Sequence, residues 1–293
     1  MDLTSIGIWA FQLGLVPTSQ GVEHLAELEE LGFGALWVPE AVGQEALTAA
    51  GILLAGSKRI VIATGIASIW ARDAMSMNAA HQTLSEAYPG RFLLGMGVSH
   101  EVMVSRIRGH NYDKPYSAMA EYLDAMDKGL YFAPLSTEPP QRVLAALGPK
   151  MLRLAADKAA GAHPYFVPPE HTAFARETLG PDPLLAVEQA VVLETDPTTA
   201  RTIARQHTST YVGLPNYTNN LKKFGFTDED FAEPGGSDRL VDTIVAWGDL
   251  DTIKTRVQAH RDAGANHVCV QVIPPVATDV PLEAWRELAP ALI

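Results

Sequence analysis

Two ionisable side chains follow apolar runs of the sequence closely enough to take part in chemistry at a strand end. Glu40 directly follows the run Ala35 to Pro39, and His100 comes shortly after the run Phe92 to Gly97. The Glu40 carboxylate can accept hydrogen bonds from a ring N–H or a sugar hydroxyl, although capping of the next helix would also explain it. His100 is the natural acid/base candidate, because the unperturbed pKa of histidine lies near neutrality.

A further histidine and three tryptophans are candidates for the lining of a substrate pocket. His163 competes with His100 for the acid/base role, and a satisfied interior histidine is the alternative. Trp9, Trp37 and Trp70 lie at or near the ends of apolar runs and could wall an aromatic pocket. Large aromatic side chains also fill barrel interiors without any ligand, so both interpretations stay open.

Two turns that contain glycine favour close contact with a ligand. Gly95 and Gly97 would let the backbone approach a flat ligand, and tight packing between strands is the competing explanation. The turn Gly148-Pro149-Lys150 opens a helix, where free N–H groups, the helix dipole and the Lys150 charge favour an anion such as phosphate. Proline at the start of a helix is also common without a ligand, so an anion site is one of two interpretations.

Eight short β-rich runs would position these residues. The runs are mostly continuous rather than alternating, as in strands that are buried on both faces. They are Ile6 to Phe11, Ala35 to Pro39, Ile60 to Ile66, Phe92 to Gly97, Val143 to Ala146, Ala162 to Val167, Leu184 to Leu193 and His267 to Ile273. Helical patterns lie between the runs, and four helix-to-strand turns contain a glycine that ends the helix.

This alternation predicts a parallel α/β fold. Eight strands in 293 residues match a (β/α)₈ TIM barrel in one domain, residues 1–293, and an open doubly wound sheet is the alternative. Residues 100–135, after strand four, and 211–247, before the last helix, interrupt the pattern and are predicted insertions. A barrel carries its active site at the C-terminal strand ends, which is where the candidate residues lie.

Charge and composition exclude several classes of protein. The chain has 22 Lys and Arg against 34 Asp and Glu, a net charge of −12, which argues against a nucleic-acid surface and against docking on anionic lipid. The single cysteine, Cys269, lies in an apolar run and is expected to be a buried thiol. Without a basic start or a long apolar run, we expect a cytoplasmic protein that does not enter a membrane.

Common catalytic and metal-binding motifs are absent. The sequence contains no HExxH, CxxC, GxSxG or Walker motif, and its nine histidines lack the spacing of metal ligands. We therefore expect no metal held by the protein.

The strand-end segments together resemble the luciferase-like monooxygenase superfamily, in particular its actinobacterial F420-dependent oxidoreductases. The similarity covers nearly the whole chain, and the order and spacing of the motifs make it specific. The matching segments are Ile6-Gly7-Ile8-Trp9, LGFGALWVPE from Leu31 to Glu40, Ala63-Thr64-Gly65-Ile66 followed by Arg72, AHQTLSEAYPGRFLLGMGVSH from Ala80 to His100, and AALGPKMLRLAADKAAGAHPYFV from Ala145 to Val167.

The resemblance implies a deazaflavin, coenzyme F420, at the C-terminal mouth of the barrel, with FMN as the alternative cofactor. It implies a non-proline cis peptide bond at Gly65-Ile66 and a role for Glu40 near the cofactor ring. The implied cofactor contacts also include the backbone after strand four and the phosphate-binding turn after strand five. These two segments are Gly97, Val98 and Ser99, and Ala146, Leu147, Gly148, Pro149 and Lys150.

One departure from the family pattern shifts the expected acid/base. Several relatives have Asp-His after strand two, whereas this chain has Glu40-Ala41. We therefore assign proton transfer to His100, with Glu40 as the second catalytic candidate. Substrate contacts are assigned to Trp9, Trp70 and His163.

The predicted activity is hydride transfer between coenzyme F420 and a small organic substrate. The alternatives are an FMN-dependent luciferase-like monooxygenase, a non-catalytic flavin- or deazaflavin-binding protein, and a barrel lyase with Lys150 as a Schiff base. The family often forms dimers, so a homodimer is a candidate assembly, and a small-molecule substrate is the expected partner.

Overall fold

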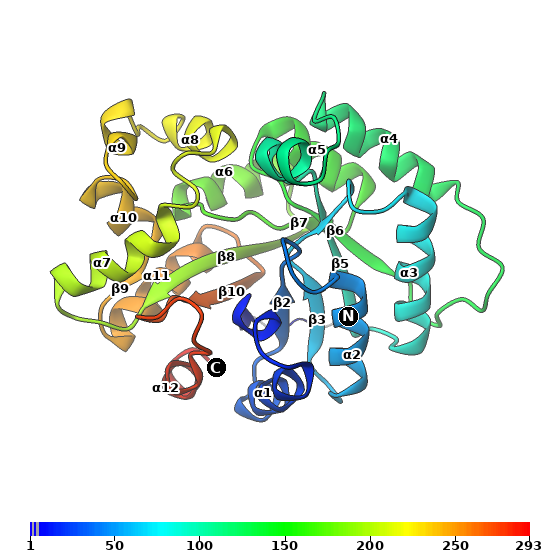
Figure 1. Cartoon of the computed structure of the whole chain (residues 1–293), viewed down its shortest axis with the longest axis horizontal. Coiled ribbons are helices and arrows are strands. Elements are labelled where there is room, and N and C mark those ends of the chain that lie inside the picture. The colour runs from blue at the N-terminus through cyan, green and yellow to red at the C-terminus, as the bar shows by residue number, and fades with distance from the viewer. Residues whose placement is uncertain (2, 4–5) are drawn as a thin grey trace.

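The predicted β-rich runs form one parallel sheet that closes into a barrel (Figure 1). The computed structural model describes residues 1, 3 and 6–293. Strand β10 pairs with both β1 and β8, so eight strands follow one another around a ring and the open doubly wound sheet is ruled out. The ring strands are β1 (Ile6–Trp9), β2 (Ala35–Val38), β3 (Val61–Thr64), β5 (Phe92–Gly97), β6 (Gln141–Leu144), β7 (Gly161–Ala162), β8 (Leu184–Val192) and β10 (His267–Val272).

Strand β7 is shorter than predicted. The sequence favours a strand over Ala162 to Val167, but regular pairing ends at Ala162. Pro164 has no N–H to donate to a neighbouring strand. Phe166 has a φ of 59°, in the left-handed region, which turns the chain out of the sheet.

Two strands of two residues each extend the ring at its C-terminal edge. β4 (Ala67–Ser68) pairs with β5, and β9 (Ala246–Trp247) pairs with β8. β4 lies between the end of β3 and helix α3, so it fixes the path of the chain beside the predicted site.

The helices cover the outside of the barrel (Figure 1). Side chains at several starts accept a backbone N–H, as Asp73 does for α3 and Asp249 for α11. The helices are α1 (Thr18–Leu31), α2 (Ala46–Ala55), α3 (Ala74–Ala87), α4 (Pro115–Asp127), α5 (Pro149–Lys158), α6 (Pro169–Leu179), α7 (Pro197–Thr208), α8 (Pro215–Lys222), α9 (Asp228–Ala232), α10 (Asp238–Ile244), α11 (Leu250–Asp262) and α12 (Leu282–Leu292), with a 3₁₀ turn η1 (Gln12–Gly14) and a π-helix η2 (Val102–Ile107).

The two predicted insertions have helices of their own. The first holds η2 and α4, and the second holds α8, α9 and α10. The second precedes α11 and not, as predicted, the last helix, because α12 follows β10. The sequence pattern missed α12, since Pro290 lies inside it and Pro281 directly precedes it.

The barrel interior is filled by inward-facing side chains. Trp37, Leu93, Val143 and Ala186 pack there with Cys269, which is fully buried and donates to the Val187 carbonyl at 3.4 Å. The prediction of a buried thiol is thus confirmed. Within the described part of the chain, no helix is both long and apolar enough to cross a membrane.

Candidate active site at the barrel mouth

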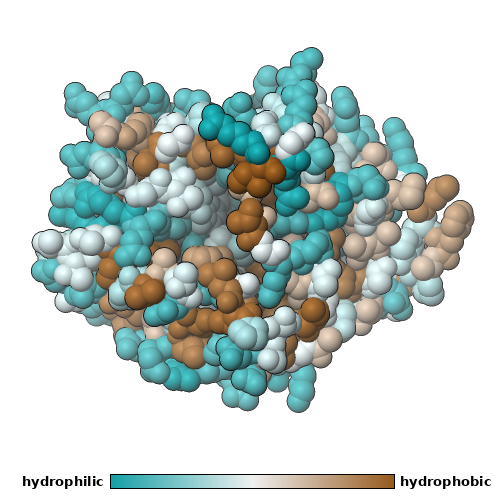
Figure 2. Space-filling view, in the orientation of Figure 1, coloured by the Kyte–Doolittle hydropathy of each residue, from teal (hydrophilic) through white to brown (hydrophobic). Residues whose placement is uncertain are grey.

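The C-terminal ends of the strands bring the predicted residues to one mouth of the barrel. Figure 2 shows a hollow near the centre of the face in view, with hydrophobic side chains along one side of it. Trp9, Glu40, Gly65 and His163 lie at the ends of β1, β2, β3 and β7 or within two residues of them. The parallel strands therefore gather residues that are up to 154 positions apart in the sequence, as a barrel mouth requires.

The end of β3 carries the cis peptide bond that the resemblance implies. The bond joins Gly65 and Ile66. A Cβ on Gly97 would lie 2.5 Å from Cδ1 of Ile66, and one on Gly95 would lie 1.9 Å from the Thr64 carbonyl oxygen. Glycine is thus required at both positions for packing against the end of β3, which favours the packing interpretation of this pair.

Glu40 is held by a cation and a backbone N–H. Its side chain is 4% exposed and forms two hydrogen bonds with the Arg72 guanidinium, which is 11% exposed. Oε2 also accepts from the Ser68 N–H at 2.7 Å. The cap of α2 is Glu45, not Glu40, so helix capping does not explain Glu40. Any cofactor contact at this position would be made beside an ion pair.

The segment after β5 is fixed by hydrogen bonds from aromatic side chains. Trp70 Nε1 donates to the Val98 carbonyl at 2.8 Å, and the Tyr112 hydroxyl donates to the Ser99 carbonyl at 3.2 Å. Ser99 adopts a φ of 56°, in the left-handed region that non-glycine residues rarely occupy. These bonds hold the backbone predicted to contact a cofactor in one conformation.

His100 reaches across the mouth to the second insertion. Nδ1 lies 3.2 Å from Asn216 Oδ1, and the imidazole lies 5.4 Å from the Tyr217 ring. Because an amide oxygen only accepts, Nδ1 donates and Nε2 of the neutral ring keeps its lone pair. Burial lowers the pKa of His100, against the opposing effect of the Asn216 bond, so the ring is neutral at pH 7.

His163 lies deeper, inside the barrel. It is 1% exposed, stacks on Trp37 at 4.2 Å, and donates from Nδ1 to the Ala186 carbonyl at 2.9 Å. Burial lowers its pKa to about 4. Its Nε2 and the Trp9 Nε1 are buried without a hydrogen-bond partner, and both lie within 3.3 Å of the position that a Cβ on Gly65 would occupy. Both side chains therefore keep unused polar atoms beside the end of β3.

The start of α5 has the features predicted for an anion site. Pro149 is the first helical residue, and the preceding Gly148 provides no side-chain cap. A Cβ on Gly148 would meet nothing within 4 Å, and Lys150 is exposed. Ala146 is buried, and the Leu147 carbonyl is taken up by His171 Nε2 at 2.9 Å. The open helix start and the Lys150 charge could hold a phosphate.

A group of neutral polar residues lies on the β7–β10 side of the mouth, and of these the sequence pointed only to Tyr165, at a strand end. The Tyr165 hydroxyl donates to Gln271 Oε1 and bonds the Tyr211 hydroxyl, both at 2.8 Å. Glu188 is 2% exposed, accepts only the Phe166 N–H through Oε2, and has its pKa raised to about 8 by burial. A lone acidic residue within the apolar run LLAVEQAVV was the available signal for Glu188. Tyr211 gave none, because it lies in an insertion.

Within the described residues, no group of three or more His, Cys, Asp or Glu side chains could hold a metal ion.

Comparison with known proteins agrees with this geometry. Residues 6–267 match the family model described as luciferase-like monooxygenase. The chain belongs to the luciferase-like monooxygenase family. The predicted TIM barrel and the family resemblance are thus both confirmed.

One relative found by its sequence is named for coenzyme F420. A Mycobacterium tuberculosis protein named "Putative coenzyme F420-dependent oxidoreductase" is 29% identical over 119 residues. That alignment covers 41% of this chain and 33% of the relative, so it spans about a third of the relative's length.

Two solved structures share the luciferase-like fold over their whole length. An F420-dependent secondary alcohol dehydrogenase in complex with an F420-acetone adduct has a TM-score of 0.78 at 17% identity, with 100% of both chains covered. The oxygenating constituent of the Pseudomonas putida 3,6-diketocamphane monooxygenase, in complex with FMN, has a TM-score of 0.67 at 16% identity, with 99% of both chains covered. At these identities the likeness is one of fold.

Proposed function

We propose that this single-domain barrel binds coenzyme F420 at its C-terminal mouth and transfers a hydride between it and a small organic substrate. The main support for this proposal is the start of α5, which has no side-chain cap and lies beside Lys150 at the mouth of a luciferase-like barrel. A phosphate-bearing cofactor fits there, because the free N–H groups and the Lys150 charge favour an anion. The name of the curated relative favours the deazaflavin over FMN.

Different residues of the mouth would bind the cofactor, contact the substrate and transfer the proton. A bound deazaflavin would supply the hydride chemistry. The turn from Ala146 to Lys150 would hold its phosphate, and Gly65, Ile66 and the Gly97–Ser99 backbone would lie against its ring, near Glu40. Trp70 would contact the substrate, with Trp9 and the buried His163 beneath the substrate site.

His100 would move the proton that accompanies the hydride. Its neutral ring donates from Nδ1 to Asn216, so Nε2 is free to take the proton of a substrate hydroxyl. In the reverse direction, the protonated ring would return that proton to a carbonyl oxygen. A His100→Ala protein that kept full turnover with an identified substrate would refute this role.

Fluorescence titration of the apoprotein with F420 and, separately, with FMN tests the proposal. We expect F420 to bind and Lys150→Glu to weaken that binding roughly thirtyfold. An exposed charge contact is worth about 1 kcal/mol, and reversal adds a repulsion of similar size. Lys254→Glu, an exposed charge reversal on α11, is the matched control and should leave binding unchanged.

The FMN-dependent monooxygenase is the second candidate, favoured by the fold likeness to an FMN complex. Tight FMN binding without F420 binding would replace the first proposal with this one. Binding of F420 without turnover across a broad substrate panel would instead support a non-catalytic binding protein.

A further inference from the structure

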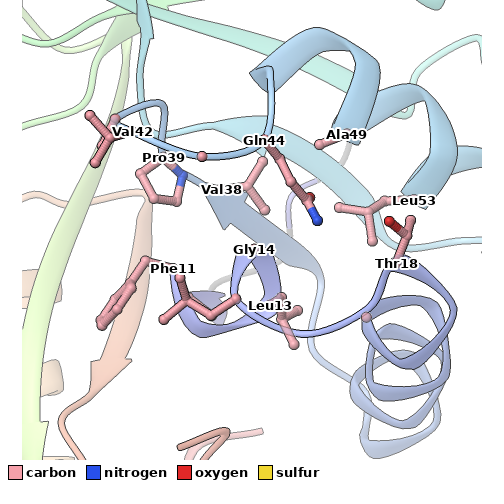
Figure 3. A pocket seen from close by; sticks show the side chains of 15 residues that line it. Phe11, Leu13, Gly14, Thr18, Val38, Pro39, Val42, Gln44, Ala49 and Leu53 are labelled. Carbon is pink, nitrogen blue, oxygen red and sulfur yellow. The ribbon is translucent and has the colours of Figure 1, made fainter. Parts of the chain in front are cut away.

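A small cavity lies beside the mouth, between η1 and the loop from β2 to α2 (Figure 3). Its volume is about 100 Å³. In Figure 3, Phe11 and Val42 lie at one end, Thr18 and Leu53 at the other, and Ala49 of α2 borders it.

The cavity adjoins the strand ends that form the candidate site. Phe11 comes two residues after Trp9, and Pro39 immediately precedes Glu40. The Val38 carbonyl accepts the Gly65 N–H at 2.8 Å, which ties the wall of the cavity to the end of β3. A ligand that reacts at the mouth could therefore extend a substituent into this space.

The lining of the cavity is apolar and uncharged. Among the described residues that line it, none carries a formal charge, and the polar side chains are Thr18 and Gln44. The carboxylates that adjoin the lining in the sequence, Glu40 and Glu45, both pair with Arg72. A charged substituent would lose its hydration here without gaining a partner, so the space favours an uncharged group.

Two exposed hydrophobic side chains mark the rim of the cavity. Val42 is 72% exposed and Leu15 is 53% exposed, and both line the cavity. A single exposed hydrophobic residue is ordinary. Two of them at the rim of one apolar cavity form an exposed apolar surface that a ligand could cover.

The volume limits the size of the group. An apolar cavity of about 150 Å³ holds benzene. A space of about 100 Å³ therefore suits an alkyl group that is smaller than benzene. We propose that this cavity is the subsite for a short alkyl group of an uncharged substrate. The proposal rests on the proposed function, since it takes the mouth as the place of reaction.

Binding of a homologous series of alcohols tests the subsite. The probes are 2-propanol, 2-butanol, 2-pentanol and 2-hexanol, titrated into the protein with and without F420, with the NMR methyl signals of Leu53 and Val38 as the readout. Each methylene that enters the cavity should tighten binding about fourfold, until the space is full.

Three variants separate the subsite from general hydrophobic binding. Ala49→Leu fills the cavity from α2 and should abolish the fourfold steps while leaving 2-propanol binding and F420 binding unchanged. Leu53→Ala enlarges the cavity and should extend the steps to a longer alcohol. Ala125→Leu, at an exposed site on α4, is the control and should behave as the wild type.

The outcomes distinguish this proposal from the proposed function. The subsite proposal would be overturned if the affinity of the wild type did not rise with each added methylene. It would also be overturned if that rise persisted in Ala49→Leu. A different result would overturn the proposed function instead. In that case F420 would not bind, but the affinity for the alcohols would still rise with each methylene in the protein without F420, and Ala49→Leu would abolish that rise. The cavity would then remain an alkyl-binding site.

Discussion

Two carboxyl groups at the barrel mouth have contrasting electrical environments. Glu40, at the end of β2, is paired with Arg72 and accepts the Ser68 N–H. Glu188, on β8, is just as buried but accepts only the Phe166 N–H, and burial raises its pKa to about 8. The same residue type is thus held as a charge on one side of the mouth and as a neutral acid on the other.

The contrast extends to the neighbours of each carboxyl group. On the β2–β4 side, the ion pair and short backbone bonds fix the chain. On the β7–β10 side, the Tyr165 hydroxyl bonds both the Tyr211 hydroxyl and Gln271 Oε1, and all three groups are neutral. The first arrangement is rigid and ionic, whereas the second offers hydroxyl and aromatic groups that can contact an uncharged ligand.

The largest expected difference between the Glu40 side and the Glu188 side of the mouth is in how the free energy of unfolding depends on pH. Glu188 is the source of this dependence. In the folded protein its pKa is about 8, against 4.5 for an ordinary glutamate. Its contribution to stability is therefore complete below pH 4.5 and is lost as the pH rises to 8, because the unfolded chain releases the proton first. Relative to Glu188→Gln, wild type should lose up to about 1.4 kcal/mol per pH unit across this range.

Urea unfolding of wild type and Glu188→Gln from pH 4.5 to 9 measures this difference. The two curves should become parallel above pH 8. Glu177→Gln, at an exposed position on α6, should track the wild type at every pH. Parallel curves for wild type and Glu188→Gln over the whole range would mean that Glu188 is ionised like Glu40, and the contrast would disappear.

The second largest expected effect is the loss of stability when the Arg72–Glu40 ion pair is broken. Arg72→Ala leaves the Glu40 carboxylate buried without its cation, which should cost about 3–5 kcal/mol in the free energy of unfolding at pH 7. Adding Glu40→Gln to that variant should restore part of the loss, since it removes the unpaired charge. Arg106→Ala, an exposed arginine on η2, is the control for the loss of one positive charge. A loss below 1 kcal/mol for Arg72→Ala would show that Glu40 is effectively solvated.

The strands and the β3 end were predictable because their signals are local. Continuous apolar runs followed by polar residues predicted all eight ring strands, and the family resemblance implied the cis peptide bond at Gly65-Ile66. Strand β7 was predicted too long, because hydrophobicity alone does not report the left-handed turn at Phe166.

The partners of the site residues were not predictable, because they depend on contacts between distant segments. His100 bonds Asn216, 116 positions away in an insertion with weak patterning. Glu40 was a recognisable candidate, but its pairing with Arg72 depends on the path of the chain through β4. The sequence pattern therefore predicts which residues reach the mouth and not which of them neutralise one another.

The smallest effect tests whether hydrogen bonds alone hold the β7–β10 side. Tyr165 donates to Gln271 and therefore accepts from Tyr211. Tyr211→Phe removes one bond and should cost about 1 kcal/mol, whereas Tyr165→Phe also leaves the buried Gln271 oxygen unpaired and should cost about 1–3 kcal/mol. Urea unfolding at 0.05 and 0.5 M NaCl should give the same two losses, since neutral pairs are not screened. Losses that shrink with salt would mean that this side too depends on charge, and equal losses would mean that the Gln271 oxygen finds another partner in Tyr165→Phe.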